Sequence, residues 1–459
     1  MGILIKDGWI LTWNGKKAEF KRGYVWVEGN LIKEVKVDEG ERQDNGRQKV
    51  LEQQCSLVID AKNCAVLPGF INAHSHLFQT YIRGLADDKP LFMWLKTAVW
   101  PLALNMTEED FYLAALIGCL ENLKCGSTTV IDMHYVHTVK ASSDMVLQAM
   151  RDAGIRGYLC RTSADQNYHP PLMEDKDTVF KEMDRLLSKW QRETGGRLNV
   201  ALGLLNPWAC SSELVRTAAE YARNNDIFIQ IHVAESEAVV QKTIEKYGQR
   251  NVDWLKAQGL LGENIQYVHG VWLEDDELEV LSQSGVSLVH CPIANMYLAS
   301  GAARVTDWLK KDINVALATD GPGSNNSQDM LEVLKFTACL QKLRTMDAAA
   351  ISCDEVLCMA TQGGARALGR EDLGVLREGA KADIITVRLD RPHISPVHRI
   401  ESALIYNANG GDVDTVLVDG RVVVWKGRST LVDEEEIWEK AQKRAQTLRR
   451  KLYEGSQGV

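Results

Sequence analysis

The chain has 459 residues, of which 45% are hydrophobic and 25% charged, the composition of a globular protein with a large buried core. Its formal net charge of -9, without any basic stripe, argues against a nucleic-acid partner. No run of about 18 apolar residues predicts a membrane span, and the first residues lack the pattern of a secretory signal. The ten cysteines are scattered without a C-x-x-C pair, so we expect reduced thiols and a cytoplasmic protein.

The two ends of the chain carry strand signals of similar character. Near the N-terminus the alternating runs are ILIKDGWILTW, GYVWVEGNLIKEVKV and CSLVIDAK, and the C-terminal third resumes with ADIITVRLD and DTVLVDGRVVVWKGR. Asp-Gly and Glu-Gly-Asn turns separate them. We therefore predict a small β-sandwich domain from residues 1–65 and 376–433, followed by a C-terminal amphipathic helix in 434–459.

Residues 66–375 alternate short apolar runs with stretches of helical periodicity. The runs that resemble buried parallel strands are AVLPGFINAH, GSTTVIDMH, IRGYLCR, NVALGLL, IFIQIHVAE, IQYVHG, VSLVHCP and NVALATDG. Eight such strands with helices between them predict a (β/α)8 barrel of the α/β class.

Histidines and aspartates follow several of these runs at their C-terminal ends. His74 and His76 end the first run, His232 the fifth and His269 the sixth, and Asp320 ends the eighth. The carboxyl ends of barrel strands converge at one mouth, so these side chains should meet there. His74 and His76 are two positions apart, so both point the same way. Three imidazoles and a carboxylate suit zinc or a similar divalent ion, with a position left for water.

These motifs resemble a known family. PGFINAHSH, HVAESE, VHG and ATDG are similar to the signature of the amidohydrolase superfamily, whose members pair a (β/α)8 barrel with a β-sandwich built from both ends. RGLADDKPLFMWL, GSTTVIDM, HCPIANMYLASG and TDGPGSNNSQDM resemble its chlorohydrolase and deaminase branch. That branch includes S-adenosylhomocysteine and methylthioadenosine deaminases, 8-oxoguanine deaminase and triazine hydrolases.

The resemblance also bears on the metal. Superfamily members with two metals usually carry a bridging lysine at the end of strand four, and NVALGLLNPW offers none. We therefore expect one divalent ion per subunit, zinc first, with iron or manganese as alternatives. The expected ligands are His74, His76, His232 and Asp320.

The expected catalytic residues are Glu235, His269 and Asp320. Asp320 takes a proton as metal-bound water attacks the ring carbon, and His269 hydrogen-bonds the water or the oxygen of the intermediate. Glu235, three residues after His232, reaches past the metal to protonate a ring nitrogen.

Substrate recognition is less settled. Met93 stands where adenosine-type deaminases of this branch usually carry a glutamate, and Leu205 lies in a stretch that lacks their histidine. Arg161 matches an arginine of those enzymes, whereas Gln79 resembles the triazine hydrolases and 8-oxoguanine deaminase. The expected substrate-binding residues are Gln79, Trp94, Arg161, Trp208, His269, Tyr297 and Ser324.

Three hypotheses follow. The first is deamination of a purine or adenosine-type compound; the second is hydrolysis of a triazine, displacing amine or halide, or deamination of an 8-oxoguanine-type base; the third is an inactive scaffold. The expected partners are a small heteroaromatic substrate and water, with a homo-oligomer suggested only by analogy. We expect His290 to be a hydrogen-bonded core residue, while His134 and His137 could line the pocket.

Overall fold

The computed structural model describes residues 2–38, 45–191 and 195–456, and it contains two sheets. The first is a parallel sheet of eight strands that follow one another in chain order. Its strands are β6 (Phe70–Ser75), β7 (Ser127–His134), β8 (Arg156–Ser163), β9 (Leu198–Leu204), β10 (Ile229–Val233), β11 (Ile265–His269), β12 (Ser287–His290) and β13 (Val315–Leu317). Just beyond β13, the backbone N–H of Asp320 donates to the carbonyl oxygen of His74 in β6 at 3.1 Å, linking the last strand to the first. The predicted (β/α)8 barrel is confirmed.

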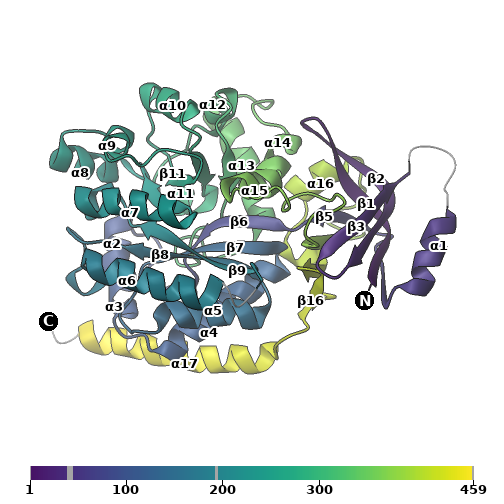
Figure 1. Cartoon of the computed structure of the whole chain (residues 1–459), viewed down its shortest axis with the longest axis horizontal. Coiled ribbons are helices and arrows are strands. Elements are labelled where there is room, and N and C mark those ends of the chain that lie inside the picture. Colours follow the sequence, from purple (N-terminus) through teal and green to yellow (C-terminus); the bar gives the residue numbers. More distant parts are fainter. Residues whose placement is uncertain (1, 39–44, 192–194, 457–459) are drawn as a thin grey trace.

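Helices surround this barrel (Figure 1). The helices between α2 and α15 are α2 (Leu91–Trp94), α3 (Trp100–Ala103), α4 (Glu108–Lys124), α5 (Ser142–Ala153), α6 (Lys176–Leu186), α7 (Ser212–Asn225), α8 (Glu237–Tyr247), α9 (Asn251–Ala257), α10 (Asp275–Ser282), α11 (Pro292–Tyr297), α12 (Val305–Lys310), α13 (Met330–Thr345), α14 (Cys353–Cys358) and α15 (Gly364–Ala367). Four of the longer barrel helices, α4, α6, α7 and α13, begin at side-chain caps; at the start of α7, for example, Ser211 accepts from the backbone N–H of Leu214 at 3.1 Å. All residues of β6, β7 and β8 are buried, as expected of strands covered on both faces.

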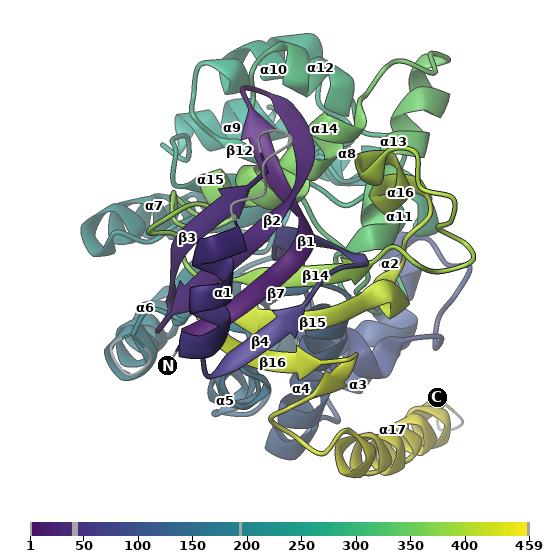
Figure 2. The ribbon, with the colours of Figure 1, turned by 90° about the vertical axis from the view of Figure 1, so that its right-hand side faces the viewer.

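The second sheet joins the two ends of the chain (Figure 2). It has nine strands in the order β17-β16-β15-β14-β5-β1-β2-β3, with β4 beside β1. They are β1 (Gly2–Asn14), β2 (Lys17–Glu28), β3 (Leu31–Val37), β4 (Leu57–Asp60), β5 (Cys64–Pro68), β14 (Ile384–Arg388), β15 (Val413–Val418), β16 (Arg421–Trp425) and β17 (Arg428–Ser429). The expected β-sandwich domain thus takes the form of one mixed sheet, packed around a core that includes Ile10, Val25, Val66 and Ile384. The helices α1 (Asn45–Gln54) and α16 (Ile400–Tyr406) flank it.

One predicted strand is in fact two. The run AVLPGFINAH contributes β5 to the terminal sheet and β6 to the barrel, and Gly69 separates them. A Cβ atom at Gly69 would lie 2.0 Å from the hydroxyl of Thr128, so only glycine allows this close passage. The domain boundary expected after residue 65 therefore falls inside β5.

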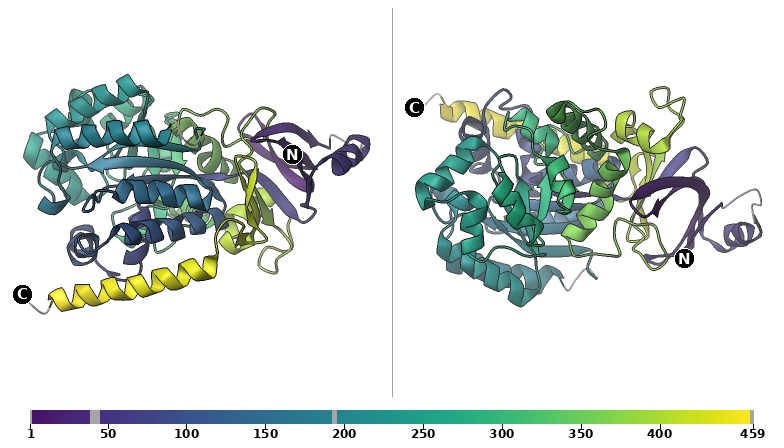
Figure 3. Two further views of the ribbon diagram at one scale, coloured as in Figure 1. Left: turned by 60° about the horizontal axis from the view of Figure 1, so that its bottom comes forward. Right: turned by 90° about the horizontal axis from the view of Figure 1, so that it is seen from above.

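The predicted C-terminal helix is α17 (Glu434–Ser456), which runs along the outside of the barrel (Figure 3). Arg444 holds it to α4 by donating to both carboxylate oxygens of Asp110, each at 2.7 Å. Among the described residues, no helix combines the length and apolarity needed to cross a membrane.

Candidate active site

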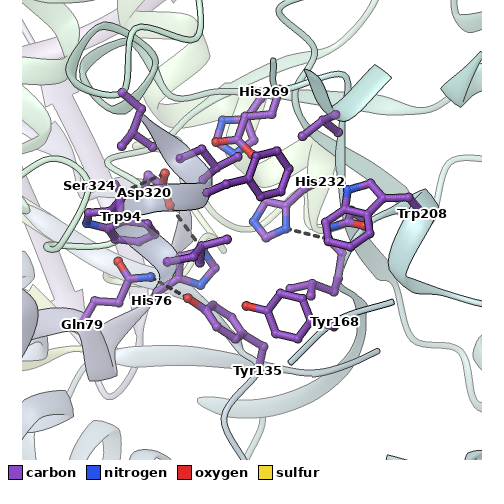
Figure 4. Close-up of a pocket in the computed structure, with 18 residues that line it drawn as sticks. His76, Gln79, Trp94, Tyr135, Tyr168, Trp208, His232, His269, Asp320 and Ser324 are labelled. Atoms are coloured by element: carbon purple, nitrogen blue, oxygen red, sulfur yellow. Dashed lines mark hydrogen bonds and ion pairs between the residues drawn. The ribbon is translucent and has the colours of Figure 1, made fainter. Parts of the chain in front are cut away.

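Polar side chains from four barrel strands meet at the carboxyl ends of those strands (Figure 4). They are His74 and His76 of the first strand, His232 of the fifth, His269 of the sixth and Asp320 after the eighth. The ring centroids of His74 and His76 lie 4.7 Å apart, and those of His74 and His232 lie 5.0 Å apart. Within the described part of the chain, the donor atoms of His74, His76 and His232 lie within 4.8 Å of one another, as do those of His74, His269 and Asp320.

Two of these histidines are oriented by backbone carbonyl groups. His76 Nδ1 lies 2.7 Å from the carbonyl oxygen of Met133, and His232 Nδ1 lies 2.7 Å from that of Leu205. A carbonyl oxygen only accepts hydrogen bonds, so each Nδ1 carries the proton and each Nε2 keeps its lone pair. Both Nε2 atoms are therefore available to bind a metal ion.

His74 is oriented by a side chain instead, since its Nδ1 lies 2.7 Å from Oε1 of Gln230. Its Nε2 is buried, has no hydrogen-bond partner among the described residues, and lies 3.3 Å from Oδ1 of Asp320. Such an atom facing a carboxylate is unfavourable unless a cation joins the two. The donor set fits one divalent metal ion. No lysine lies between the end of β9 at Leu204 and Trp208 to bridge a second.

Asp320 is held by its own loop. The hydroxyl of Ser324 donates to Oδ2 at 3.0 Å, and the backbone N–H of Gly321 donates to Oδ1 at 2.7 Å. Burial opposes ionisation of this carboxyl, but its close contact with His74 and the neighbouring histidines lowers its pKa below the ordinary value. Asp320 and His269 also have φ angles of 62° and 76°, a left-handed conformation that costs about 1–3 kcal/mol per non-glycine residue.

His76 and His269 are neutral at physiological pH. Burial, followed by the charge of His74, lowers the pKa of His76 to about 3, and burial lowers that of His269 to about 4. Neutral imidazole is the form that binds metals. His269 Nδ1 donates to Oδ1 of Asn295 at 3.0 Å, which leaves its Nε2 as an acceptor at the donor cluster.

Glu235 faces the same cavity from the segment after β10. The preceding residue, Ala234, has a φ of 48° where the chain leaves the strand. Burial, followed by the charge of Asp320, raises the pKa of Glu235 to about 8. Its carboxyl group is therefore protonated at neutral pH and is able to donate a proton.

The cavity has an empty volume of about 580 Å³ and is apolar away from the donor cluster. Aromatic rings form much of its wall; Phe92 and Trp208 meet edge to face with ring centroids 6.0 Å apart. Its lining consists of His76, Gln79, Leu91, Phe92, Trp94, Leu95, Tyr135, Tyr168, Leu205, Asn206, Trp208, His232, Glu235, Val239, His269, Leu298, Asp320 and Ser324.

Comparison with known proteins identifies this arrangement. A sequence model of the amidohydrolase family matches residues 65–423. The chain belongs to the amidohydrolase family. It is 37% identical over 446 residues to a 5'-deoxyadenosine deaminase of Methanosarcina mazei, covering 97% of this chain and 98% of the relative. It is 36% identical to a 5-methylthioadenosine/S-adenosylhomocysteine deaminase of Thermococcus sibiricus, covering 92% of this chain and 94% of the relative.

Solved structures agree with this family assignment. An adenosine deaminase from Xanthomonas campestris with bound zinc superposes with a TM-score of 0.88 at 26% identity, covering 98% of both chains. Atrazine chlorohydrolase from Arthrobacter aurescens, complexed with zinc, superposes with a TM-score of 0.88 at 26% identity, covering 96% of this chain and all of that one. This amidohydrolase is therefore a hydrolase that acts on C–N bonds, and its histidine-rich cluster is a metal site.

Five of the seven expected substrate-binding residues line the amidohydrolase cavity; they are Gln79, Trp94, Trp208, His269 and Ser324. Arg161 does not, because it is buried with Nη2 2.6 Å from Oε1 of Glu174 and Nη1 3.2 Å from Oγ of Ser163. Tyr297 also lies outside the lining, and its hydroxyl hydrogen-bonds Asp87.

Other residues of the site were missed from sequence. Gln230 lies two positions before His232 on the same strand, so the two-residue period of a strand already placed it toward the barrel interior. Asn295 and Tyr168 come from segments between barrel strands, and their sequence offers no comparable signal. Met93, which takes the place of the glutamate usual in the adenosine-type deaminases that the sequence resembles, is 51% exposed and does not line the cavity.

The remaining histidines near the barrel mouth do not reach the cavity. His290 is buried as expected, yet neither ring nitrogen has a hydrogen-bond partner among the described residues. His134 is also buried without a partner, with its ring 5.2 Å from that of His137. His137 donates from Nε2 to the carbonyl oxygen of Thr162 at 3.0 Å.

Proposed function

We propose that this amidohydrolase is a zinc-dependent deaminase with one metal ion per subunit, which replaces the exocyclic amino group of an adenosine-type compound by oxygen and releases ammonia. Two relatives support the adenosine-type substrate. The match to a 5'-deoxyadenosine deaminase covers 97% of this chain, and the match to a 5-methylthioadenosine/S-adenosylhomocysteine deaminase covers 92%. The choice of zinc is supported by the zinc bound in both solved neighbours.

The observation that carries the proposal is the buried carboxyl group of Glu235, which faces the same mostly apolar cavity as the metal donor cluster. Glu235 lines this cavity with His76, His232 and Asp320, and its pKa is raised to about 8. Addition of water to an aromatic C–N carbon places negative charge on the neighbouring ring nitrogen. A proton from Glu235 neutralises that charge, a contribution of about 10²–10⁴ in rate.

The ligands of the proposed ion are His74, His76, His232 and Asp320. When bound there, a divalent cation lowers the pKa of a coordinated water to about 7 and so supplies a nucleophile. Asp320 accepts a proton from the attacking water at its carboxylate. His269 Nε2 hydrogen-bonds that water and keeps it directed at the ring carbon, because Asn295 holds the other ring nitrogen.

The cavity walls suit a flat ring. Trp94, Tyr135, Tyr168 and Trp208 offer aromatic surfaces for stacking, and Trp94 is fixed by donation from Nε1 to the carbonyl oxygen of Gly323 at 2.9 Å.

A second candidate substrate is an s-triazine or an 8-oxoguanine-type base. It is favoured by Gln79, which lines the cavity and donates from Nε2 to the hydroxyl of Tyr135 at 2.9 Å. It is also favoured by the position of Met93, which brings no carboxylate into the cavity to hold a ribose diol. Water attack on a ring carbon displaces amine or halide by the same residues.

The test is ammonia release from zinc-loaded protein. We expect turnover of 5'-deoxyadenosine, methylthioadenosine or S-adenosylhomocysteine, with Glu235→Gln protein as the inactive control. Turnover of melamine, hydroxytriazines or 8-oxoguanine alone would transfer the assignment to the second candidate. A purified chain without stoichiometric metal, inactive after metal addition, would support an inactive scaffold instead.

We also propose that the enzyme works in the cytoplasm. All ten cysteines are unpaired, five of them in buried positions, as in proteins of a reducing compartment.

A further inference from the structure

A chain of buried amides crosses the barrel interior behind His74. Gln230 of β10 accepts at Oε1 from His74 Nδ1 at 2.7 Å and donates from Nε2 to Oε1 of Gln266 at 2.7 Å. Gln266 of β11 donates in turn to the carbonyl oxygen of Ala367 at 2.7 Å. Gln230 Nε2 also donates to the carbonyl oxygen of Ala73, at 2.9 Å. Both glutamines are completely buried.

The backbone carbonyl groups that this chain of amides meets fix the direction of each of its hydrogen bonds. The carbonyl oxygens of Ala367 and Ala73 only accept, so Gln266 and Gln230 must present their NH2 groups to them. Gln230 then has only its Oε1 left for His74. Because that oxygen also only accepts, His74 must carry its proton on Nδ1 and its lone pair on Nε2.

We propose that Gln230, anchored by Gln266, is a positioning residue that sets the tautomer of His74 and thereby the affinity for the metal. The proposal rests on the metal site described above. His76 and His232 obtain the same orientation from backbone carbonyl groups. His74 alone among these three depends on side chains, and partners of this kind typically change metal affinity about 10- to 100-fold.

The test is the zinc dissociation constant of the full chain, measured by competition with a chromophoric chelator in the absence of substrate. We expect Gln230→Leu to weaken zinc binding roughly 10- to 100-fold. Gln230→Glu keeps an oxygen for His74 but loses the NH2 group that donates to Ala73 and Gln266, so it should weaken zinc binding less than Gln230→Leu does. The matched control is Gln341→Leu, a buried glutamine of α13 that donates to the carbonyl oxygen of Ala303 far from the ligands.

Unchanged zinc affinity in Gln230→Leu would overturn the proposal. So would equal weakening in Gln230→Glu, because an oxygen facing His74 would then make no difference to the affinity. If Gln230→Leu does not fold, Gln266→Leu tests the same chain of hydrogen bonds. This variant should weaken zinc binding by a smaller factor. Unchanged zinc affinity in Gln266→Leu would overturn the role of Gln266 as the anchor of Gln230. The measurement uses no substrate, so it would remain valid even if the proposed deaminase activity were wrong. A wild-type protein that binds no zinc would instead overturn the metal site itself.

Discussion

Glu235 and Asp320 face one cavity, and their pKa values are displaced in opposite directions. Burial and the charge of Asp320 raise the pKa of Glu235 to about 8. At Asp320 the contact with His74 and the neighbouring histidines outweighs burial and lowers the pKa. At neutral pH the cavity therefore holds one protonated and one ionised carboxyl group. These opposite displacements support the proposed division of proton transfer, with Glu235 as the acid and Asp320 as the base.

Glu235→Gln tests the acid role. The amide keeps the shape of the side chain but cannot transfer a proton, so we expect kcat to fall by about 10²–10⁴. Metal content, measured by elemental analysis, should stay at the wild-type level. The control is Glu237→Gln, an exposed carboxylate in the first turn of α8, which should leave kcat unchanged. A parallel loss of metal in Glu235→Gln would show that the residue is structural instead.

The raised pKa of Glu235 also predicts a pH dependence. The carboxyl group is protonated below its pKa and loses its proton above it, so activity should fall as pH rises through this value. The pKa of about 8 belongs to the protein without metal, and a bound cation favours the carboxylate; we therefore expect the fall at or below pH 8. The measurement is kcat/KM of the zinc-loaded enzyme against pH. A profile that stays level up to pH 9 would remove Glu235 from proton transfer.

The barrel and the donor cluster could be predicted from sequence because both follow local rules. The apolar strand runs have a short, regular period, and His74, His232 and Asp320 stand where parallel strands must end together. The substrate-recognition residues were harder to predict, because the segments between strands determine which side chains reach the cavity. Arg161 has the expected position, yet Glu174 from the following segment pairs with it at 2.6 Å and holds it outside the cavity.

The metal site predicts specific losses of metal. His74→Ala and Asp320→Ala each remove one of the four proposed donors, so zinc occupancy after dialysis should fall well below one ion per chain. The matched control is His290→Asn. His290 is as completely buried as His74, ends the neighbouring barrel strand β12, and does not line the cavity. Its zinc occupancy should match the wild type. Full occupancy in His74→Ala would overturn the ligand assignment.

The junction of the two sheets depends on a buried ion pair. Arg156 of β8 donates to both carboxylate oxygens of Asp383, at 2.7 and 3.0 Å, and to Asp419 at 3.0 Å. The Arg156 and Asp383 side chains are only 1% and 4% exposed, so solvent screens this pair poorly. Arg156→Met would leave the Asp383 carboxylate buried without its cation.

We expect Arg156→Met to lower the free energy of unfolding by roughly 3–5 kcal/mol, measured by urea denaturation of the zinc-loaded protein. The double variant Arg156→Met/Asp383→Asn removes both charges and should lose less, because no uncompensated charge stays buried. The control is Lys440→Met, which breaks an exposed pair with Glu436 on α17 and should leave stability unchanged. If the double variant were less stable than Arg156→Met alone, the loss would come from hydrogen bonds of Asp383 to the backbone, such as the one donated by the N–H of Asp419 at 2.7 Å, and not from the buried charge.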